Sequence, residues 1–170
     1  MHSFHLGVDV AKKKLDCELD LPSGKVRNKS VENTPAGFTK LHKLLLDNKA
    51  QPQDVHVCME ATGTYWEAVA EFLSDLGYKV SVVNPAQIKA YAGSHLVRTK
   101  TDKVDASLIR RFCGERNPPA WQAPAPSHRA LRALVLRLDN LQAMRLQESN
   151  RLVARSGDRA SHRADPPTAR

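Results

Sequence analysis

The sequence has few cysteines, few aromatic residues and no long apolar run. Its three cysteines, Cys17, Cys58 and Cys113, are far apart and form no C-x-x-C pair. We expect them to be reduced and buried, because neither a disulfide framework nor a zinc site fits this spacing. No stretch approaches the roughly 20 apolar residues that cross a bilayer, and residues 1–10 lack the apolar core of a signal peptide. The absences predict a cytoplasmic protein with no membrane partner.

The excess of positive charge belongs to one part of the chain. The protein has 170 residues and a net charge of +8. Residues 1–94 hold eleven basic and eleven acidic residues, whereas residues 95–170 hold fifteen basic residues, thirteen of them arginine, and seven acidic ones. Arginine's planar guanidinium suits bidentate contacts with phosphate, so the second part is predicted to meet a polyanion. A GC-rich genome would also explain the change from lysine to arginine, but not the net charge.

The hydrophobic pattern predicts three strands followed by alternating helices and strands. The strands are expected at residues 4–10, 14–21, 25–32, 55–59 and 79–83. Helices are expected from Thr34 to about residue 49, from residue 65 to 76 with a capping box of Thr64 and Glu67, and from Asn84 onwards. The order predicts an α/β fold, a ribonuclease H-like mixed five-stranded sheet with flanking helices.

Four acidic residues fall at the ends of these predicted elements. Asp9 and Glu60 follow short apolar runs, and Asp102 and Asp105 share one face of a helix that is expected to begin near Thr101. A charge at the end of a buried strand is costly unless it is paired or binds a metal, and clustered carboxylates suit a hard divalent cation such as Mg²⁺ or Mn²⁺. Each acid alone has a structural explanation, since Asp102 and Asp105 would also suit a helix N-terminus and Asp9 would suit a turn.

These residues resemble the DEDD transposases of insertion-sequence family 110, which include the pilin-gene inverting recombinases. The resemblance covers roughly residues 4–155, and its motifs read GVDVAKK at 7–13, MEATGTYW at 59–66, VNP at 83–85 and KTDKVDA at 100–106. It implies a RuvC-like domain in which Asp9, Glu60, Asp102 and Asp105 are the catalytic, metal-binding acids during DNA cutting and rejoining. It also implies DNA partners, the element ends and the target, and a structured guide RNA.

Family members are longer, with a second domain that carries a serine needed for strand transfer. We therefore interpret the chain as a truncated transposase, with a DEDD domain over 1–117, a proline-rich linker over 118–126, a long helix over 127–155 and a disordered tail over 156–170. Leu131, Leu134, Leu138 and Leu141 follow the spacing of a coiled-coil seam. The long helix is predicted to join subunits into a homo-oligomer, although the same stripe could dock on its own domain.

Basic residues surround the predicted acidic helix. Arg98, Lys100 and Lys103 flank Asp102 and Asp105, and Arg110 and Arg111 follow on the same helix. These five are predicted to hold nucleic-acid phosphates without reading base sequence. The main alternative to a transposase is an inert nucleic-acid-binding or dimerising remnant. An actin-like or sugar-kinase ATPase is less favoured, because the sequence has no second glycine-rich phosphate loop.

Overall fold

The computed structural model describes residues 4–94 and 102–161, with side chains described for residues 4–94 and 106–153. The chain divides into two units, Met1–Ala123 and Pro124–Arg170. The first unit contains the elements β1 (Phe4–Val10), β2 (Lys14–Asp20), β3 (Val26–Glu32), α1 (Pro35–Asp47), η1 (Pro52–Asp54), β4 (Val55–Glu60), α2 (Glu67–Asp75), β5 (Lys79–Val83), α3 (Pro85–Ser94) and α4 (Asp102–Arg116). The second contains α5 (Pro126–Ser161).

The five strands form one mixed sheet in the order β3-β2-β1-β4-β5. β1, β2 and β3 make an antiparallel meander, while β1, β4 and β5 run parallel to one another. This order, with β1 at the centre, is that of the ribonuclease H fold, so the predicted fold class is confirmed. The parallel pairing of β1 with β4 brings the ends of these two strands to the same edge of the sheet.

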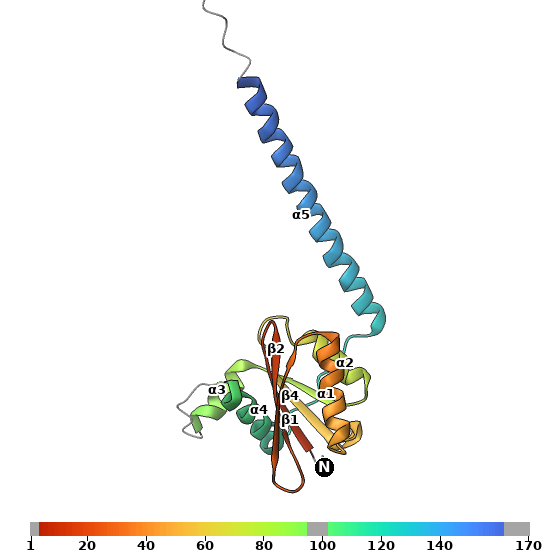
Figure 1. The fold of residues 1–170 in the computed structure, drawn as a ribbon, viewed down its shortest axis with the longest axis vertical. Coiled ribbons are helices and arrows are strands. Elements are labelled where there is room, and N and C mark those ends of the chain that lie inside the picture. Colours follow the sequence, from red (N-terminus) through yellow and green to blue (C-terminus); the bar gives the residue numbers. More distant parts are fainter. Residues whose placement is uncertain (1–3, 95–101, 162–170) are drawn as a thin grey trace, which may run out of the picture. The chain divides into compact units, whose positions relative to one another are not determined.

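Helices cover both faces of the sheet, with α1 and α2 on one side and α3 and α4 on the other (Figure 1). α1 packs against β3 and α2, whereas α4 packs against β1, β2 and β4. Along β1, Phe4, Leu6, Val8 and Val10 are buried in the main core, which includes side chains of α1 and α2. Because side chains alternate along a strand, His5, Gly7 and Asp9 lie on the face that α4 covers.

Local sequence signals mark the start of α1 and the end of α2. Thr34 caps α1, with its hydroxyl accepting a hydrogen bond from the amide of Gly37, and Pro35 is the first helical residue, as predicted. Gly77, at φ 87°, follows α2. The predicted capping box of α2 is wrong, because Trp66 takes the N-cap position without a side-chain cap bond. The indole of Trp66 instead donates to the carbonyl of Gly63.

The first part of the predicted linker docks on the first unit. The amide of Trp121 donates to the carbonyl of Val80 at 2.7 Å, and the Ser81 hydroxyl donates to the carbonyls of Pro118 and Pro119. The Trp121 ring meets Trp66 edge-on, with centroids 5.5 Å apart. The linker therefore hydrogen-bonds to β5, the outer strand at this side of the sheet.

The long helix is observed, but it is longer than predicted. α5 extends to Ser161, past the predicted helix end at residue 155, while residues 162–170 of the predicted tail lie outside the described part of the chain. Its large apolar side chains are exposed, from Leu141 at 46% to Leu134 at 68%. No helix among the described residues is long and apolar enough to cross a membrane.

Candidate active site

Asp9 and Glu60 lie at neighbouring positions on the two central strands. The parallel register pairs Gly7 with Cys58 and Val8 with Met59, so the next residues along the two strands are Asp9 and Glu60. Both side chains are half-buried. Because paired residues in adjacent strands share a face, both acids belong to the face that α4 covers. The structure thus brings together two of the four predicted acids.

The surroundings of this pair are rich in negative charge. Asp16 lies opposite Asp9 in the β1–β2 register, and its carboxylate forms an ion pair with Lys14 at 2.9 Å. Burial, with Asp16 and Asp9 close by, raises the pKa of the Cys17 thiol well above its ordinary value. The Glu60 carboxylate accepts a hydrogen bond from the Thr62 hydroxyl at 2.9 Å, which restrains its orientation.

A close backbone contact determines where α4 lies on β1. A Cβ at Gly7 would lie 2.2 Å from the carbonyl oxygen of Ala106 and 2.5 Å from the amide nitrogen of Arg110. A Cβ at Gly114 would lie 3.5 Å from the ring of His5. Later residues of α4 therefore meet earlier residues of β1, and the two elements run in opposite directions. Only glycine at position 7 permits this approach.

This direction brings the start of α4 towards Asp9. Asp9 is two residues beyond Gly7, about 6.6 Å along the strand. On α4, the four residues before Ala106 span about 6 Å in the corresponding direction. The first turn of α4, which contains Asp102 and Asp105, is therefore the part of the helix backbone beside Asp9. The side chains of Asp102 and Asp105 lie outside the described residues. In the described part of the chain, no three His, Cys, Asp or Glu side chains form a metal-binding group.

Arg110, predicted to hold a nucleic-acid phosphate, lies against acidic side chains of β2. Its side chain is 15% exposed, and its guanidinium forms ion pairs with Glu18 at 2.8 Å and with Asp20 at 3.6 Å. These ion pairs anchor α4 to β2, and the expectation that Arg110 also contacts nucleic acid stays a prediction. Arg111 is exposed on α4. Arg98, Lys100 and the side chain of Lys103 lie outside the described residues.

The sequence did not lead us to expect the polar cluster beneath α4, which consists of His5, Glu18, Asp20 and Arg110. His5 Nδ1 and an Asp20 carboxylate oxygen lie 2.9 Å apart, beside the Arg110 ion pairs. Burial raises the pKa of Asp20, but hydrogen bonds from His5 and the charges of His5 and Arg110 outweigh it, so the pKa is lowered. A signal was present, because Asp16, Glu18 and Asp20 alternate along β2 and therefore share one face. An acidic strand face predicts a cationic cover, which Arg110 provides.

The three cysteine thiols are buried, so their exposure does not indicate reactivity. All three are free and buried, which agrees with the expectation from their spacing. A hydrogen bond with Cys58 and burial raise the pKa of Cys113, whose thiol also donates to the carbonyl of His56 at 3.5 Å. Cys58 and Cys113 belong to the small core between β4 and α4. They therefore help to pack α4 on the sheet.

Comparisons with known proteins identify relatives over nearly the whole chain. A family model described as a transposase, of the DEDD type of insertion-sequence family 110, matches residues 6–155. The pilin gene-inverting protein of Moraxella bovis is 35% identical over 156 residues, which are 92% of this chain and 48% of the relative. That of Moraxella lacunata is 34% identical over the same span. The chain thus spans about half the length of these curated relatives.

Among solved structures, T. thermophilus RuvC in complex with a Holliday junction substrate is similar, with a TM-score of 0.46 and 14% identity. The match covers 70% of this chain and 99% of that one.

Proposed function

Because the chain belongs to the DEDD transposase family of insertion-sequence family 110, we propose that it supplies the acidic active site for metal-dependent cutting and rejoining of DNA. The observation that supports this most directly is the β1–β4 register, which puts Asp9 beside Glu60 at the end of the two central strands. We assign catalytic and metal-binding roles to Asp9, Glu60, Asp102 and Asp105.

The donor set fits a hard divalent cation. Asp9 and Glu60 offer carboxylate oxygens from one sheet face, and the backbone at the start of α4 lies beside Asp9, where Asp102 and Asp105 would complete the set. Oxygen-only donors favour Mg²⁺ or Mn²⁺ over zinc. When bound, the cation would supply electrostatic stabilisation of the negative charge that develops on a reacting phosphate. The Thr62 hydroxyl would orient Glu60 for this role, and Gly7 would hold α4 close enough for its acids to take part.

DNA would be held by cations near this site. Arg98, Lys100, Lys103, Arg110 and Arg111 remain the proposed phosphate contacts, because all five lie close in sequence to Asp102 and Asp105 and Arg111 is exposed. Such contacts position a nucleic acid without reading its bases. Element ends and target DNA are the proposed substrates, with a structured guide RNA as a further proposed partner.

Self-association is proposed for α5. Its exposed apolar side chains include Leu131, Leu134, Leu138 and Leu141, which recur at alternating spacings of three and four residues. This is the spacing of a coiled-coil seam, and exposure of so many leucines on one helix is costly unless a partner covers them. A second copy of the same helix would provide a matching stripe.

A metal-dependent melt tests the shared acidic site. A cation that binds only the folded state, at about a hundred times its dissociation constant, stabilises the fold by about 2.7 kcal/mol. We expect millimolar MnCl₂ to raise the melting temperature of the wild type, and to have no effect on an Asp9→Asn, Glu60→Gln double variant. An Asp47→Asn, Glu71→Gln double variant is the charge-matched control and should keep the shift. An equal shift in both double variants would contradict the proposed site.

Activity requires a separate assay, since the chain spans about half the length of its curated relatives. We propose that this chain alone binds metal and DNA, and cleaves weakly at most, in a manner abolished by Glu60→Gln. A plasmid recombination test would compare the chain alone with the chain plus the remaining part of a relative. Recombination only in the second case would show that the acidic site is intact and acts together with the remaining part of the relative. Intact metal and DNA binding without recombination in either case would favour the inert remnant.

A further inference from the structure

One segment of the first unit has an excess of positive charge, which the zero net charge of residues 1–94 hides. Residues 22–49 contain six Lys and Arg residues and two Asp and Glu residues, a net charge of +4. The remaining residues of 1–94 carry five basic and nine acidic side chains, a net charge of −4. The zero net charge of residues 1–94 is therefore the sum of a basic segment and an acidic remainder. The basic segment forms the tip of the β2–β3 hairpin, β3 and α1.

Four cations of this segment lie on one side of the domain, namely Arg27, Lys29, Lys40 and Lys43. The β2–β3 register pairs Leu19 with Arg27 and Cys17 with Lys29. Leu19 and Cys17 are buried in the core that includes α1, so Arg27 and Lys29 point to the α1 face of the sheet. Asp9 belongs to the opposite face.

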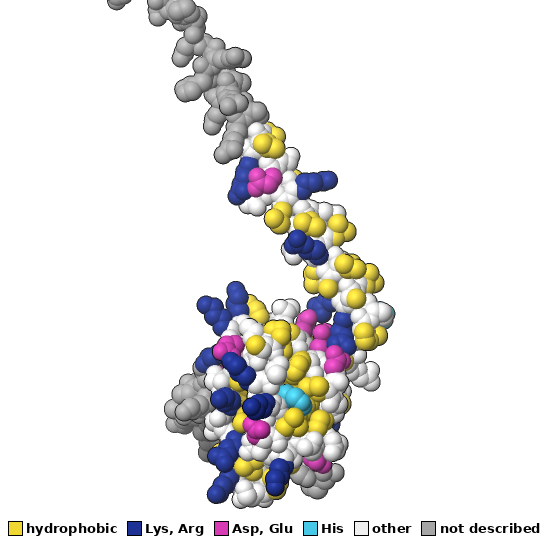
Figure 2. All heavy atoms as spheres, turned by 45° about the vertical axis from the view of Figure 1, so that its right-hand side comes forward, with side chains coloured by type: hydrophobic (Ala, Val, Ile, Leu, Met, Phe, Trp, Pro, Cys, Tyr) yellow, Lys and Arg dark blue, Asp and Glu magenta, His cyan; other side chains and the backbone are white. Residues whose placement is uncertain are grey.

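α1 carries the other two cations and lies directly beside β3. A Cβ at Gly37 would lie 1.9 Å from the carbonyl oxygen of Glu32, so the first turn of α1 touches the end of β3. Lys40, one turn further on, forms an ion pair with Glu32 at 3.0 Å, and Lys43 follows at the next turn. All four cations are exposed, and Figure 2 shows Lys and Arg side chains gathered on this side of the domain.

The two outer strands of the sheet differ in how their edges are covered. The linker residues 117–121 hydrogen-bond to β5, whereas β3 pairs only with β2 among the described elements. Exposed cations on an outer strand can serve to prevent edge-to-edge aggregation. That role would account for Arg27 and Lys29, but it would not require Lys40 and Lys43 on the neighbouring helix.

We propose that Arg27, Lys29, Lys40 and Lys43 form a docking surface for the phosphate backbone of a nucleic acid. The four side chains are exposed, so the surface suits a polyanion that is held by charge and not by a pocket. It lies on the face of the sheet opposite Asp9 and Glu60, and a strand bound there is out of reach of the acids. The chain would thus hold one nucleic-acid segment without cutting it while another occupies the acidic site.

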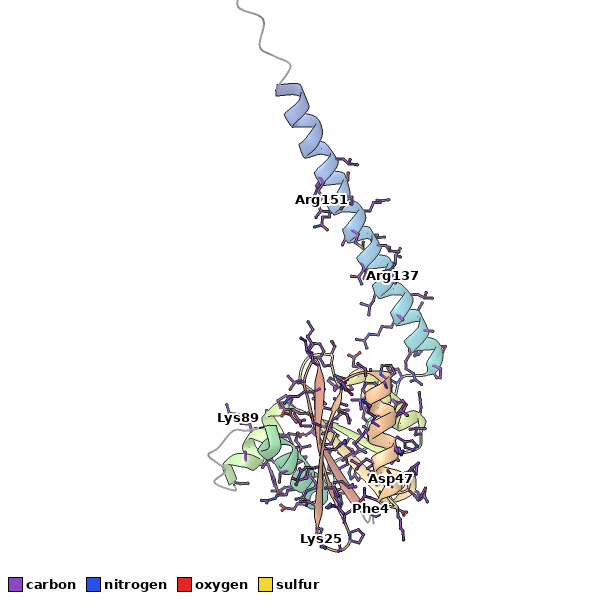
Figure 3. The ribbon with its side chains drawn as sticks, viewed as in Figure 1. Phe4, Lys25, Asp47, Lys89, Arg137 and Arg151 are labelled. Atoms are coloured by element: carbon purple, nitrogen blue, oxygen red, sulfur yellow. The ribbon has the colours of Figure 1, made fainter. Side chains whose placement is uncertain are left out.

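Lysine footprinting tests the location of this surface in the full chain. Acetylation with a soluble succinimidyl ester, read by mass spectrometry, would be compared with and without a duplex DNA and with and without an RNA hairpin, in the absence of divalent metal. We expect Lys29 and Lys43 to be protected several-fold, and Lys89 on α3, across the sheet in Figure 3, to remain reactive. The arm with the larger protection identifies DNA or RNA. Protection of Lys89 alone, or equal protection of all lysines, would overturn the proposal.

Salt dependence tests the charge mechanism. An Arg27→Gln, Lys29→Gln, Lys43→Gln variant keeps the Lys40–Glu32 ion pair and should fold, as circular dichroism would verify. For duplex DNA each lost phosphate contact lowers the log-log salt slope by about 0.9, so the slope should fall by about 2 to 3 units. A Lys12→Gln, Lys13→Gln, Lys89→Gln variant removes the same charge elsewhere and should change the slope less. Equal effects of the two variants would show that only net charge matters and would overturn the proposal, as would tighter binding to phosphatidylserine vesicles than to either nucleic acid.

Discussion

Replacement of Gly7 by alanine should push α4 away from the sheet and destabilise the fold. The added methyl would lie 2.2 Å from the Ala106 oxygen, 2.5 Å from the Arg110 nitrogen and 2.9 Å from the Arg110 Cα. Carbon contacts are favourable only near 3.5 Å or beyond, so the helix must move by roughly 1 Å. All three atoms belong to the helix backbone, and no change of rotamer can relieve the clash.

The cost of this movement can be bounded. Overpacking a core costs about 1 to 3 kcal/mol, and a clash with backbone atoms belongs at the upper end of that range. The movement would also loosen the buried Ile109 and Cys113 and lengthen the ion pair between Arg110 and Glu18. We therefore expect Gly7→Ala to lower the free energy of unfolding by about 3 kcal/mol, measured as the shift in urea midpoint at an unchanged m-value.

Gly114→Ala provides a matched control within the same helix. A Cβ there would make ordinary contacts of 3.5 and 3.6 Å with the His5 ring. Alanine is favoured over glycine inside a helix by about 0.5 to 1 kcal/mol, so this variant should be as stable as the wild type or slightly more stable. If the free energy of unfolding of Gly7→Ala lies within about 0.5 kcal/mol of the wild-type value, α4 does not pack on β1 as described. The position of α4 would then no longer support Asp102 and Asp105 as ligands of the proposed metal site.

Three further predictions concern α4, the acidic strand and α5. Arg110→Met leaves two largely buried carboxylates without their cation and should lower the free energy of unfolding by about 2 to 4 kcal/mol in urea denaturation, whereas a change under 1 kcal/mol would refute the anchoring role. The pKa of Asp20 is lowered in the folded state, so its ionised carboxylate stabilises the fold. This stabilisation is present above the unfolded pKa, near 4, and is lost as the pH falls through the folded value. Below about pH 4 the wild type should therefore lose stability more steeply than Asp20→Asn, and parallel stability curves would contradict this. Leu134→Glu with Leu138→Glu should shift the protein towards monomer in sedimentation equilibrium, and an unchanged mass would exclude α5 as the interface.

Most of the strand pattern could be predicted because local signals and tertiary packing agree. β1 keeps its predicted bounds, since alternating burial of Leu6 and Val8 requires the same register that the sequence shows. The helix start at Thr34 was also predictable, because a side-chain cap and a proline act locally. The capping box at Thr64 failed where tertiary contacts competed, as the Trp66 ring packs against Trp121 and its indole bonds to Gly63.

The sequence by itself determined the ribonuclease H-like order of elements and the positions of Asp9 and Glu60 at two strand ends. It did so because strand periodicity and turn residues act over a few neighbours. Only the tertiary structure decided that Arg110 turns inward, because Glu18 and Asp20 lie at least ninety positions away in sequence and no local pattern joins them. Likewise, the role of Gly7 follows from a contact between β1 and α4, and the basic surface of β3 and α1 follows from the register that puts Arg27 and Lys29 beside a helix. Long-range contacts depend on how faces of distant elements meet, and that is determined by packing of the whole domain.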